Sequence, residues 1–374
     1  MESLLHRQAE TLGNAPFLQT WSPERGIICT LSFGEFARRV KLAERVLLSH
    51  GVGDARVAFL AHPSAQYFIY CYAVINLGGV VVNLNWRQPK KSLVEMTTLS
   101  VSSVLVASTA FRDEAAQLLT DTALGELFWL PTAAPAGGFS PDHGFWLTAL
   151  DTENVDEAQI PLRQPHNVAI DESSTAVIMF TSGSTSTPKA VPLTQYGLLW
   201  NCEQKRLMSP ELVGAPHAGT LSFLPNFHVI GFTNNFLFNL HAGVRCAVLH
   251  DASTSPLSPR LILQACADLR PTVVDTVVWL AEEMLLLLDM GDAAAAPLKE
   301  VRYLLAGGAA LNEELLLPIL RKHGLALWPH YGQTELGGPA TLGGLKGSLS
   351  AMRPPPCVQW GEQMKDLHVW GMHV

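Results

Sequence analysis

The sequence predicts an α/β fold in which helices cover two mainly parallel sheets. Short apolar runs rich in β-branched residues alternate with helix-length segments, which is the pattern of parallel strands joined by helical crossovers. The chain has 374 residues, 48% of them hydrophobic and 16% charged, so it can bury a large core and is long enough for two or three subdomains. Residues 131–166 lack any sustained periodicity and divide the alternation into two halves.

The first half opens with a helix start signal. Ser32-Phe33-Gly34-Glu35 has the form of a capping box, in which the hydroxyl and the carboxylate each satisfy an unpaired backbone N–H. Apolar residues then recur at helical spacing, and Gly51 is typical of a residue that ends a helix. Four apolar runs follow, each separated from the next by a helix-length segment, and we expect strands at residues 56–61, 80–84, 103–107 and 176–180.

Residues 67–86 contain no charged side chain and are about as long as a bilayer-spanning helix. Three asparagines interrupt this stretch, and Gly78-Gly79 marks the end of a helix before the run Val80-Val81-Val82. We therefore expect a core helix, a turn and a buried strand here, and no transmembrane segment.

The second half repeats the same alternation after the polar interval. We expect residues 131–166, which are rich in Pro, Ala, Gly and acidic residues, to form a surface linker. An amphipathic helix is expected from Leu311 to His323, ending before Gly324. Strands are expected at residues 220–224, 246–249, 272–278 and 302–305. The predicted subdomains are residues 1–165 and 166–345.

Charge and cysteine usage exclude several classes of protein. The formal net charge of -8 and the pI near 5.9 come without a cluster of Lys and Arg, which argues against a nucleic-acid surface. The six cysteines form no CxxC pair and no metal-binding cluster with histidine, so we expect reduced thiols in a reducing compartment. Charges at the very N-terminus argue against a cleaved leader. The expected location is cytoplasmic, with the peroxisome left open.

A hydroxyl-rich segment follows the strand expected at residues 176–180. It reads Thr181-Ser182-Gly183-Ser184-Thr185-Ser186-Thr187-Pro188-Lys189. Its hydroxyls, backbone N–H groups and ammonium can surround a polyphosphate. The alternative is an ordinary polar surface loop, but the carboxyl end of a parallel strand is where α/β sheets bind ligands.

A P-loop is the natural rival for this segment, and it does not fit. That motif requires Gly directly before the Lys and a hydroxyl directly after it. Pro188 and Ala190 occupy those two positions. Phosphate binding by another architecture is the better interpretation.

The stretch TSGSTSTPKAV resembles the phosphate-loop signature of the adenylate-forming superfamily, which includes acyl-CoA synthetases, with Ser186 where the family usually has Gly. Three further segments resemble the family in the same order along the chain. They are LPNFHVIGF at residues 224–232, RYLLAGGAAL at residues 302–311 and YGQTE at residues 331–335. The resemblance extends to about Gly361 and implies the large N-terminal domain of an acyl-CoA synthetase.

The resemblance implies roles for the residues of the last two segments. Gly307, Gly308 and Ala309 would lie against the adenine, where glycine lets a flat base approach the backbone. Tyr331 would stack on it, with Gly332 and Gln333 beside it. Thr334 would donate to a phosphate oxygen, and Glu335 would bind Mg²⁺ as a hard carboxylate ligand. Taken alone, Glu335 would be read as a solvated surface charge.

The resemblance also implies that His228 helps to position the acid carboxylate, although an isolated His beside apolar residues is more often a core histidine. Amino-acid-activating relatives place an acidic residue near this position. This chain has no Asp or Glu from Leu221 to His250, and an unpaired buried ammonium is costly. We therefore expect a fatty or aryl acid as the substrate.

The implied reaction joins a carboxylic acid to the α-phosphorus of ATP and then transfers the acyl group from AMP to a thiol, with CoA as the expected co-substrate. Such reactions depend on positioning and charge neutralisation. Lys189, Thr334, Glu335 and His228 are the expected catalytic residues, with ATP and Mg²⁺ as cofactors.

Further segments of the family are not found in this sequence. A ribose-binding Asp, a hinge and a small C-terminal domain with a catalytic Lys would follow Glu335, and residues 346–374 match only the incomplete start of the next β subdomain. We therefore expect the chain to be truncated and weakened in catalysis. Two alternatives stay open: a non-catalytic nucleotide- or acyl-binding protein, and an adenylation module of a larger synthetase or reductase.

Overall fold

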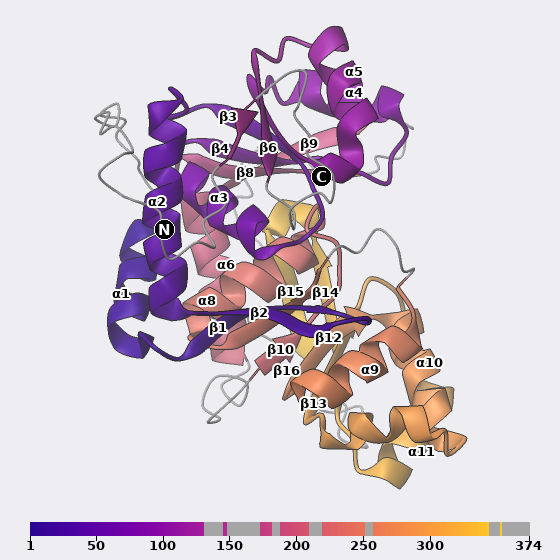
Figure 1. Cartoon of the computed structure of the whole chain (residues 1–374). Coiled ribbons are helices and arrows are strands. Elements are labelled where there is room, and N and C mark those ends of the chain that lie inside the picture. The colour runs from indigo at the N-terminus through magenta and orange to yellow at the C-terminus, as the bar shows by residue number, and fades with distance from the viewer. Residues whose placement is uncertain are drawn as a thin grey trace, which may run out of the picture.

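The computed structural model describes residues 1–130, 145–147, 173–181, 188–208, 219–250, 257–343 and 352–353. Two sheets with helices packed against them make up this part of the chain (Figure 1). The mixed α/β class and the two mainly parallel sheets predicted from the sequence are confirmed.

The first sheet has seven strands in the order β7-β6-β5-β3-β4-β8-β9. All neighbours are parallel except β8 and β9, which form an antiparallel hairpin. Strands β3, β4, β5, β6 and β8 are mostly apolar because both faces of the sheet are buried there, whereas the edge strand β9 is largely exposed. The strands of this sheet are β3 (Arg56–Leu60), β4 (Val80–Asn83), β5 (Val104–Ser108), β6 (Glu126–Leu130), β7 (Phe145–Trp146), β8 (Thr175–Thr181) and β9 (Lys189–Thr194).

The second sheet has nine strands in the order β16-β15-β14-β13-β12-β10-β11-β1-β2. Six neighbouring strands run parallel, namely β14, β13, β12, β10, β11 and β1. Antiparallel strands lie at both ends: β2 beside β1, and β15 and β16 beside β14. The strands are β1 (Pro16–Ser22), β2 (Gly26–Ser32), β10 (Gly219–Leu221), β11 (Arg245–Leu249), β12 (Val273–Val277), β13 (Tyr303–Gly307), β14 (Leu327–Gln333), β15 (Gly338–Gly343) and β16 (Met352–Arg353).

Helices cover the sheets in layers. One face of the first sheet packs on α2 and α3, and the other packs on α4 and α5. One face of the second sheet packs on α9, α10, η4 and α11. The helices are α1 (Glu2–Leu12), α2 (Phe33–Ser49), α3 (Ala65–Asn76), α4 (Lys90–Leu99), η1 (Thr109–Phe111), α5 (Arg112–Asp121), α6 (Gln195–Met208), η3 (Ile230–Leu237), α8 (Phe238–Ala242), α9 (Pro259–Leu269), α10 (Val278–Asp289), η4 (Ala293–Glu300), α11 (Glu313–His323) and η5 (Thr334–Leu336).

Local signals read from the sequence give the expected elements. Ser32 caps α2 by accepting a hydrogen bond from the Glu35 backbone N–H at 3.1 Å. The interrupted apolar stretch folds as α3, a glycine turn and β4, and all residues of α3 are buried. In the part of the chain described, no helix has the length and hydropathy needed to cross a bilayer.

The predicted boundary between residues 165 and 166 does not follow the sheets. Strands β1 and β2 lie in the first predicted subdomain, but β1 pairs with β11 of the second sheet. Strands β8 and β9 lie in the second predicted subdomain, but β8 pairs with β4 of the first sheet, with Val81 opposite Val177. Order along the chain suggested contiguous units, whereas strand pairing interleaves them.

The predicted linker over residues 131–166 lies mostly outside the described residues. Within it, however, Phe145–Trp146 form β7 and pair in parallel with β6, and Leu147 is 1% exposed. The prediction of a surface linker is wrong at this point, because a two-residue strand is too short to produce a periodic pattern.

Candidate nucleotide and acyl site

The β8–β9 hairpin places both ends of the hydroxyl-rich segment, Thr181 and Lys189, at the carboxyl edge of the first sheet. Thr181 pairs with Lys189 across the hairpin, so the segment forms the connection between the two strands. Thr181 is half-buried and Lys189 is exposed. The predicted ligands Ser182, Gly183, Ser184 and Thr185 fall outside the described residues, as does Ser186. The structure thus places the base of the turn and its lysine.

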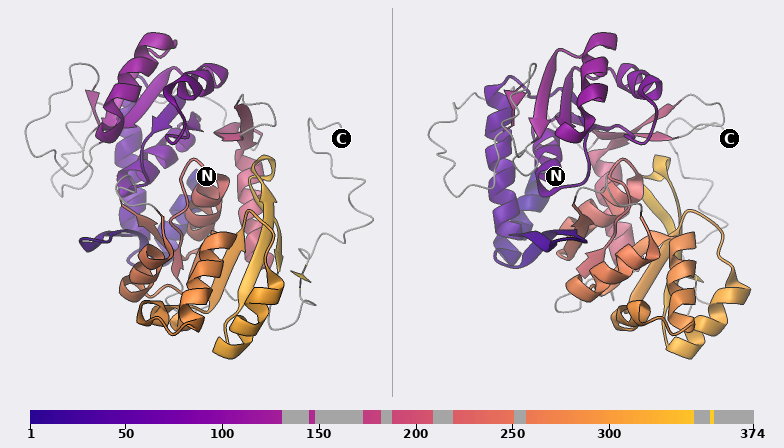
Figure 2. Two further views of the ribbon diagram at one scale, coloured as in Figure 1. Left: turned by 90° about the vertical axis from the view of Figure 1, so that its right-hand side faces the viewer. Right: turned by 45° about the vertical axis from the view of Figure 1, so that its right-hand side comes forward.

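The YGQTE segment reaches this hairpin from the second sheet. Tyr331, Gly332 and Gln333 end β14, and Thr334 and Glu335 begin the short helix η5. Both β8 and β9 contact η5, and the two views of Figure 2 show the hairpin beside the ends of β14 and β15. Tyr331 and Glu335 are exposed, and Thr334 is half-buried. Hence two segments far apart in the sequence share one edge of the molecule.

Helix α6 holds the turn that follows Glu335. Asn201 donates hydrogen bonds from Nδ2 to the carbonyl oxygens of Leu336 at 3.3 Å and Pro339 at 3.2 Å. A Cβ added to Gly337 would lie 3.6 Å from the Leu198 side chain, so this glycine packs directly on the same helix. Because α6 follows β9 without a gap, one helix links the hairpin to the YGQTE segment.

The two glycines of the GGAAL segment differ in their surroundings. A Cβ on Gly307 would lie 2.4 Å from Cε1 of His330, so the imidazole fills the room that this glycine leaves. The sequence interpretation assigned this room to the adenine, and on the Cβ side of Gly307 the imidazole occupies it. Gly308 has a φ of 87°, which favours glycine, and it and Ala309 face open space or solvent. The carboxyl end of β13 is thus open to a ligand only from Gly308 onward.

His228 lies on a turn that is tied to the first sheet. Asn226 donates from Nδ2 to the carbonyl oxygen of Ala61 at 3.1 Å, just after β3. A Cβ on Gly231 would be 2.2 Å from the Pro225 carbonyl oxygen, so only glycine lets η3 start so close to the turn. His228 reaches the surface. The protein packed around it and, to a smaller degree, the charge of Arg87 lower the pKa of His228, which favours a neutral imidazole near pH 7.

Trp86 and Arg87, which sequence reasoning did not single out as site residues, adjoin this turn. The Trp86 and Phe227 rings meet edge-on with centroids 5.4 Å apart, and the Arg87 guanidinium lies 4.9 Å from the Trp86 centroid. These residues follow β4, the parallel neighbour of β8. A signal was available: side chains directly after a buried parallel strand lie at the ligand-binding edge.

The described residues fit a triphosphate with Mg²⁺. Lys189 and Arg87 are exposed cations at the edge of the first sheet, and Tyr331 offers a ring that is 56% exposed. No cluster of three or more His, Cys, Asp or Glu that could hold a metal occurs in the described ranges. Mg²⁺ in nucleotide sites commonly takes one or two carboxylates together with phosphate oxygens and waters. Glu335 suits such a minimal protein contribution.

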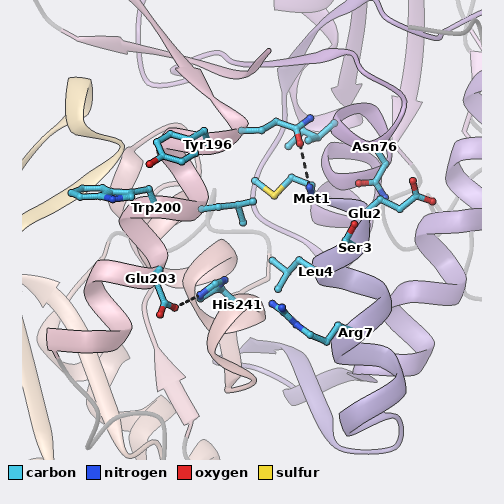
Figure 3. A pocket seen from close by; sticks show the side chains of 13 residues that line it. Met1, Glu2, Ser3, Leu4, Arg7, Asn76, Tyr196, Trp200, Glu203 and His241 are labelled. Atoms are coloured by element: carbon cyan, nitrogen blue, oxygen red, sulfur yellow. Dashed lines mark hydrogen bonds and ion pairs between the residues drawn. The ribbon is translucent and has the colours of Figure 1, made fainter. Parts of the chain in front are cut away.

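A separate pocket of about 650 Å³ lies on the other face of α6, between that helix, α1, α3 and α8 (Figure 3). Tyr196 and Trp200 line its outer side, and the His241 Nε2 is 2.8 Å from the Glu203 carboxylate. None of the predicted site residues lines it. Helix α6 therefore turns Asn201 toward the YGQTE turn and Trp200 toward this pocket.

Comparison with known proteins places these features in one family. The sequence profile described as "AMP-binding enzyme" matches residues 5–361. Feruloyl-CoA synthase of Amycolatopsis sp is 29% identical over 307 residues, which are 82% of this chain and 54% of that protein. The mitochondrial malonate–CoA ligase of Mus musculus is 25% identical over 341 residues, 85% of this chain and 53% of that protein. The chain thus spans about half the length of the curated relatives it matches.

Solved structures have the same fold. A putative long-chain-fatty-acid CoA ligase from Rhodopseudomonas palustris gives a TM-score of 0.74 at 20% identity, covering 94% of this chain and 80% of that one. O-succinylbenzoate CoA synthetase from Bacillus subtilis, solved with ATP and magnesium, gives 0.68 at 20% identity, covering 91% and 61%.

Proposed function

The chain belongs to the AMP-binding enzyme family, and on that premise we propose that it serves the ATP-dependent activation of a carboxylic acid as acyl-AMP for transfer to a thiol such as CoA. The observation that carries this proposal is the contact of the β8–β9 hairpin with η5. It brings the ammonium-bearing turn and the Thr334-Glu335 pair to the same edge of the molecule. Those are the groups that a triphosphate with its metal requires.

The proposed chemistry has two steps. An oxygen of the acid carboxylate attacks the α-phosphorus of ATP, and the bond from that phosphorus to the pyrophosphate oxygen breaks. A thiolate then attacks the acyl carbon, the bond to the AMP oxygen breaks, and a thioester forms. Neither step needs a nucleophilic side chain, so the protein contributes positioning and charge neutralisation.

Each residue has a proposed task in the first step. Lys189 and the hydroxyls of the Thr181–Thr185 stretch would neutralise and orient the phosphates, with a further hydrogen bond from the Thr334 hydroxyl. Tyr331 would stack on the adenine beside Gly308 and Ala309. Glu335 would hold Mg²⁺, which would supply charge neutralisation at the phosphates when bound. The neutral imidazole of His228 would orient the acid carboxylate.

A fatty or aryl acid is the proposed substrate class. The absence of Asp and Glu from Leu221 to His250 leaves this segment without a partner for a substrate ammonium. The name feruloyl-CoA synthase, carried by two relatives, agrees with an aryl acid.

Acid-dependent exchange of labelled pyrophosphate into ATP tests the proposal, with ATP affinity measured in parallel by calorimetry. We expect Lys189→Ala and Glu335→Gln each to weaken MgATP binding or exchange by about tenfold or more. Lys299→Ala and Glu314→Gln remove exposed charges elsewhere and should leave both unchanged. Equal MgATP affinity in all five proteins would contradict the assignment, as would faster exchange with amino acids than with fatty or aryl acids.

Binding without exchange would support the alternative of a nucleotide-binding protein that does not turn over. That outcome would separate nucleotide binding from complete adenylation, for which the chain covers about half of each curated relative.

A further inference from the structure

Three ionisable side chains meet in the interior between α6 and the second sheet. The Lys205 Nζ lies 3.7 Å from Oδ2 of Asp275, and the His330 Nε2 lies 3.2 Å from Oδ1 of the same carboxylate. Their side chains are 3%, 1% and 4% exposed. The Lys205 ammonium also donates to the Asn234 carbonyl oxygen at 3.2 Å and lies 4.3 Å from the Phe238 ring centroid. The three residues are called the triad below.

The triad occupies one face of three neighbouring strands. Asp275 is on β12 opposite Leu305 of β13, and His330 is on β14 opposite Gly307 of β13. Residues 305 and 307 point to the same face because side chains alternate along a strand. The His330 ring crosses the middle strand over Gly307, where a Cβ would meet it at 2.4 Å. Gly307 therefore provides the passage through which His330 reaches Asp275.

Stability alone does not account for buried charges of this kind. Taking ions out of water carries a desolvation penalty, and well-packed apolar side chains of similar volume are often at least as stabilising. Some buried charged groups instead fix one arrangement of the elements that carry them. The location of the triad indicates which elements it would hold in place. His330 directly precedes Tyr331 of the YGQTE segment, and Lys205 lies one helical turn beyond Asn201 on α6.

Helix α6 thus holds the YGQTE segment at both ends. Before the segment, Lys205 reaches His330 through Asp275; after it, Asn201 donates to the carbonyl oxygens of Leu336 and Pro339. The same helix continues from β9, which carries Lys189. A shift of α6 or of β14 would therefore change the spacing between the two phosphate-binding segments.

We propose that Lys205, Asp275 and His330 are positioning residues that set the Tyr331–Glu335 segment against the β8–β9 hairpin. This inference rests on the proposed function for its purpose, because it names how the nucleotide site of that function is held in shape. The triad would not touch the nucleotide. It would act through the backbone of β14 and through α6.

The test uses the 374-residue chain and compares local order with global stability. In the double variant Lys205→Met with Asp275→Leu, apolar side chains replace the ion pair, so the melting midpoint should stay close to that of the parent. We expect amide hydrogen exchange of residues 331–336 to become about tenfold faster while exchange in β3, β4 and β5 stays unchanged. Affinity for MgATP should fall by about tenfold or more.

A purely stabilising role predicts a different result, namely that a double variant with parental melting would also have parental exchange at residues 331–336. That result would overturn the proposal. If the double variant does not fold, His330→Asn provides the same comparison, because the shorter side chain cannot span Gly307. Faster exchange confined to residues 331–336 would support the inference, and unchanged exchange would refute it.

The exchange measurement does not depend on nucleotide. If the parent chain binds no MgATP, the proposed function fails, and the exchange of residues 331–336 still decides whether the triad positions this segment. Leu118→Val, a change in the packing of α5 against the first sheet, is the matched control and should leave residues 331–336 unaffected.

Discussion

Different kinds of side chain pack at the carboxyl edges of the two sheets. At the first sheet, His62, Trp86 and Phe111 follow β3, β4 and β5, and their rings contact one another edge-on or tilted at centroid distances from 4.6 to 6.0 Å. Trp86 also meets the Phe227 ring at 5.4 Å. At the second sheet, the buried Lys205 and His330 side chains both face the Asp275 carboxylate, at 3.7 Å and 3.2 Å. The first edge therefore depends on shape, and the second depends on charge.

This contrast matters because the proposed nucleotide site lies between the two edges. Aromatic packing tolerates small displacements, since dispersion and burial vary gradually with position. Buried charges do not, because their balance is lost when one partner moves or is removed. We expect the second edge to be the more sensitive reporter of mutation and pH.

Removing the central carboxylate of the triad should have the largest effect. Asp275→Ala leaves the Lys205 ammonium buried without its counter-ion, which typically costs about 3–5 kcal/mol. Urea denaturation followed by circular dichroism measures this loss. Asp113→Ala removes an exposed carboxylate and should change stability by no more than about 0.5 kcal/mol. Equal effects of the two substitutions would contradict the description of the second edge.

Truncating the central ring of the first edge should cost less. Trp86 is half-buried, so Trp86→Ala should lose about 2 kcal/mol, below the range seen for fully buried aromatic residues. The same denaturation experiment measures it. Trp86→Phe keeps most of the packing and should restore at least half of the loss. A cost above that of Asp275→Ala would reverse the proposed order of the two edges.

A side chain at position 307 should lower the stability of the fold, because it would fill the space over β13 that the His330 ring occupies. Gly307→Ala forces a methyl group against the His330 ring, for which overpacking costs of about 1–3 kcal/mol are usual. In a His330→Ala background the clash disappears, so Gly307→Ala should cost much less stability there than in the parent. A double-mutant cycle measures this difference between the two backgrounds. Gly125→Ala, whose Cβ would meet only an ordinary contact at 3.7 Å, is the control. Additive effects at residues 307 and 330 would mean that the ring does not occupy this space.

As the pH falls, the second edge should lose stability before the first. We expect this effect to be the smallest of the four predicted here. Burial by itself raises the pKa of Asp275, but the contacts with His330 and Lys205 outweigh it and bring that pKa below its usual value of 3.8. A carboxyl whose pKa is lowered by folding adds stability above its unfolded pKa, and that stability is lost as the pH falls through the folded pKa.

Amide hydrogen exchange between pH 5 and pH 2.5, corrected for intrinsic rates, measures which edge loses protection first. This range includes about 3.9, the pKa of an unperturbed Asp. Residues 327–333 should lose protection before residues 104–108. The Lys205→Met and Asp275→Leu double variant should abolish the difference. Simultaneous loss in the parent would show that the triad does not govern acid sensitivity.

The elements were predictable where a local cause produces them. The capping box at Ser32 and the glycine turn after α3 act within a few residues, and their helices and strands are where the sequence places them. The order of strands in the sheets is set by contacts between distant residues such as Leu18 and Cys246, and no local pattern signals it. For that reason the interleaving of the two predicted subdomains was missed.

The candidate site divides in the same way. The hydroxyl-rich turn and YGQTE carry their chemistry in contiguous residues, so the sequence could indicate them. No local sequence pattern marks Asp275 or His330, and they come together only when β12, β13 and β14 lie side by side. Gly307 was assigned to a ligand because the residue that fills its space comes from another strand.

The pairing of β1 with β11 has a consequence for how the protein is made. Residues Phe17, Leu18 and Trp21 are fully buried in the finished sheet, yet Leu18 must wait for Cys246 to leave the ribosome before its strand has a neighbour on that side. Strands that wait for a distant partner are exposed to aggregation during synthesis. We therefore expect the nascent N-terminal hairpin to be exposed to aggregation until residues 245–249 have been synthesised.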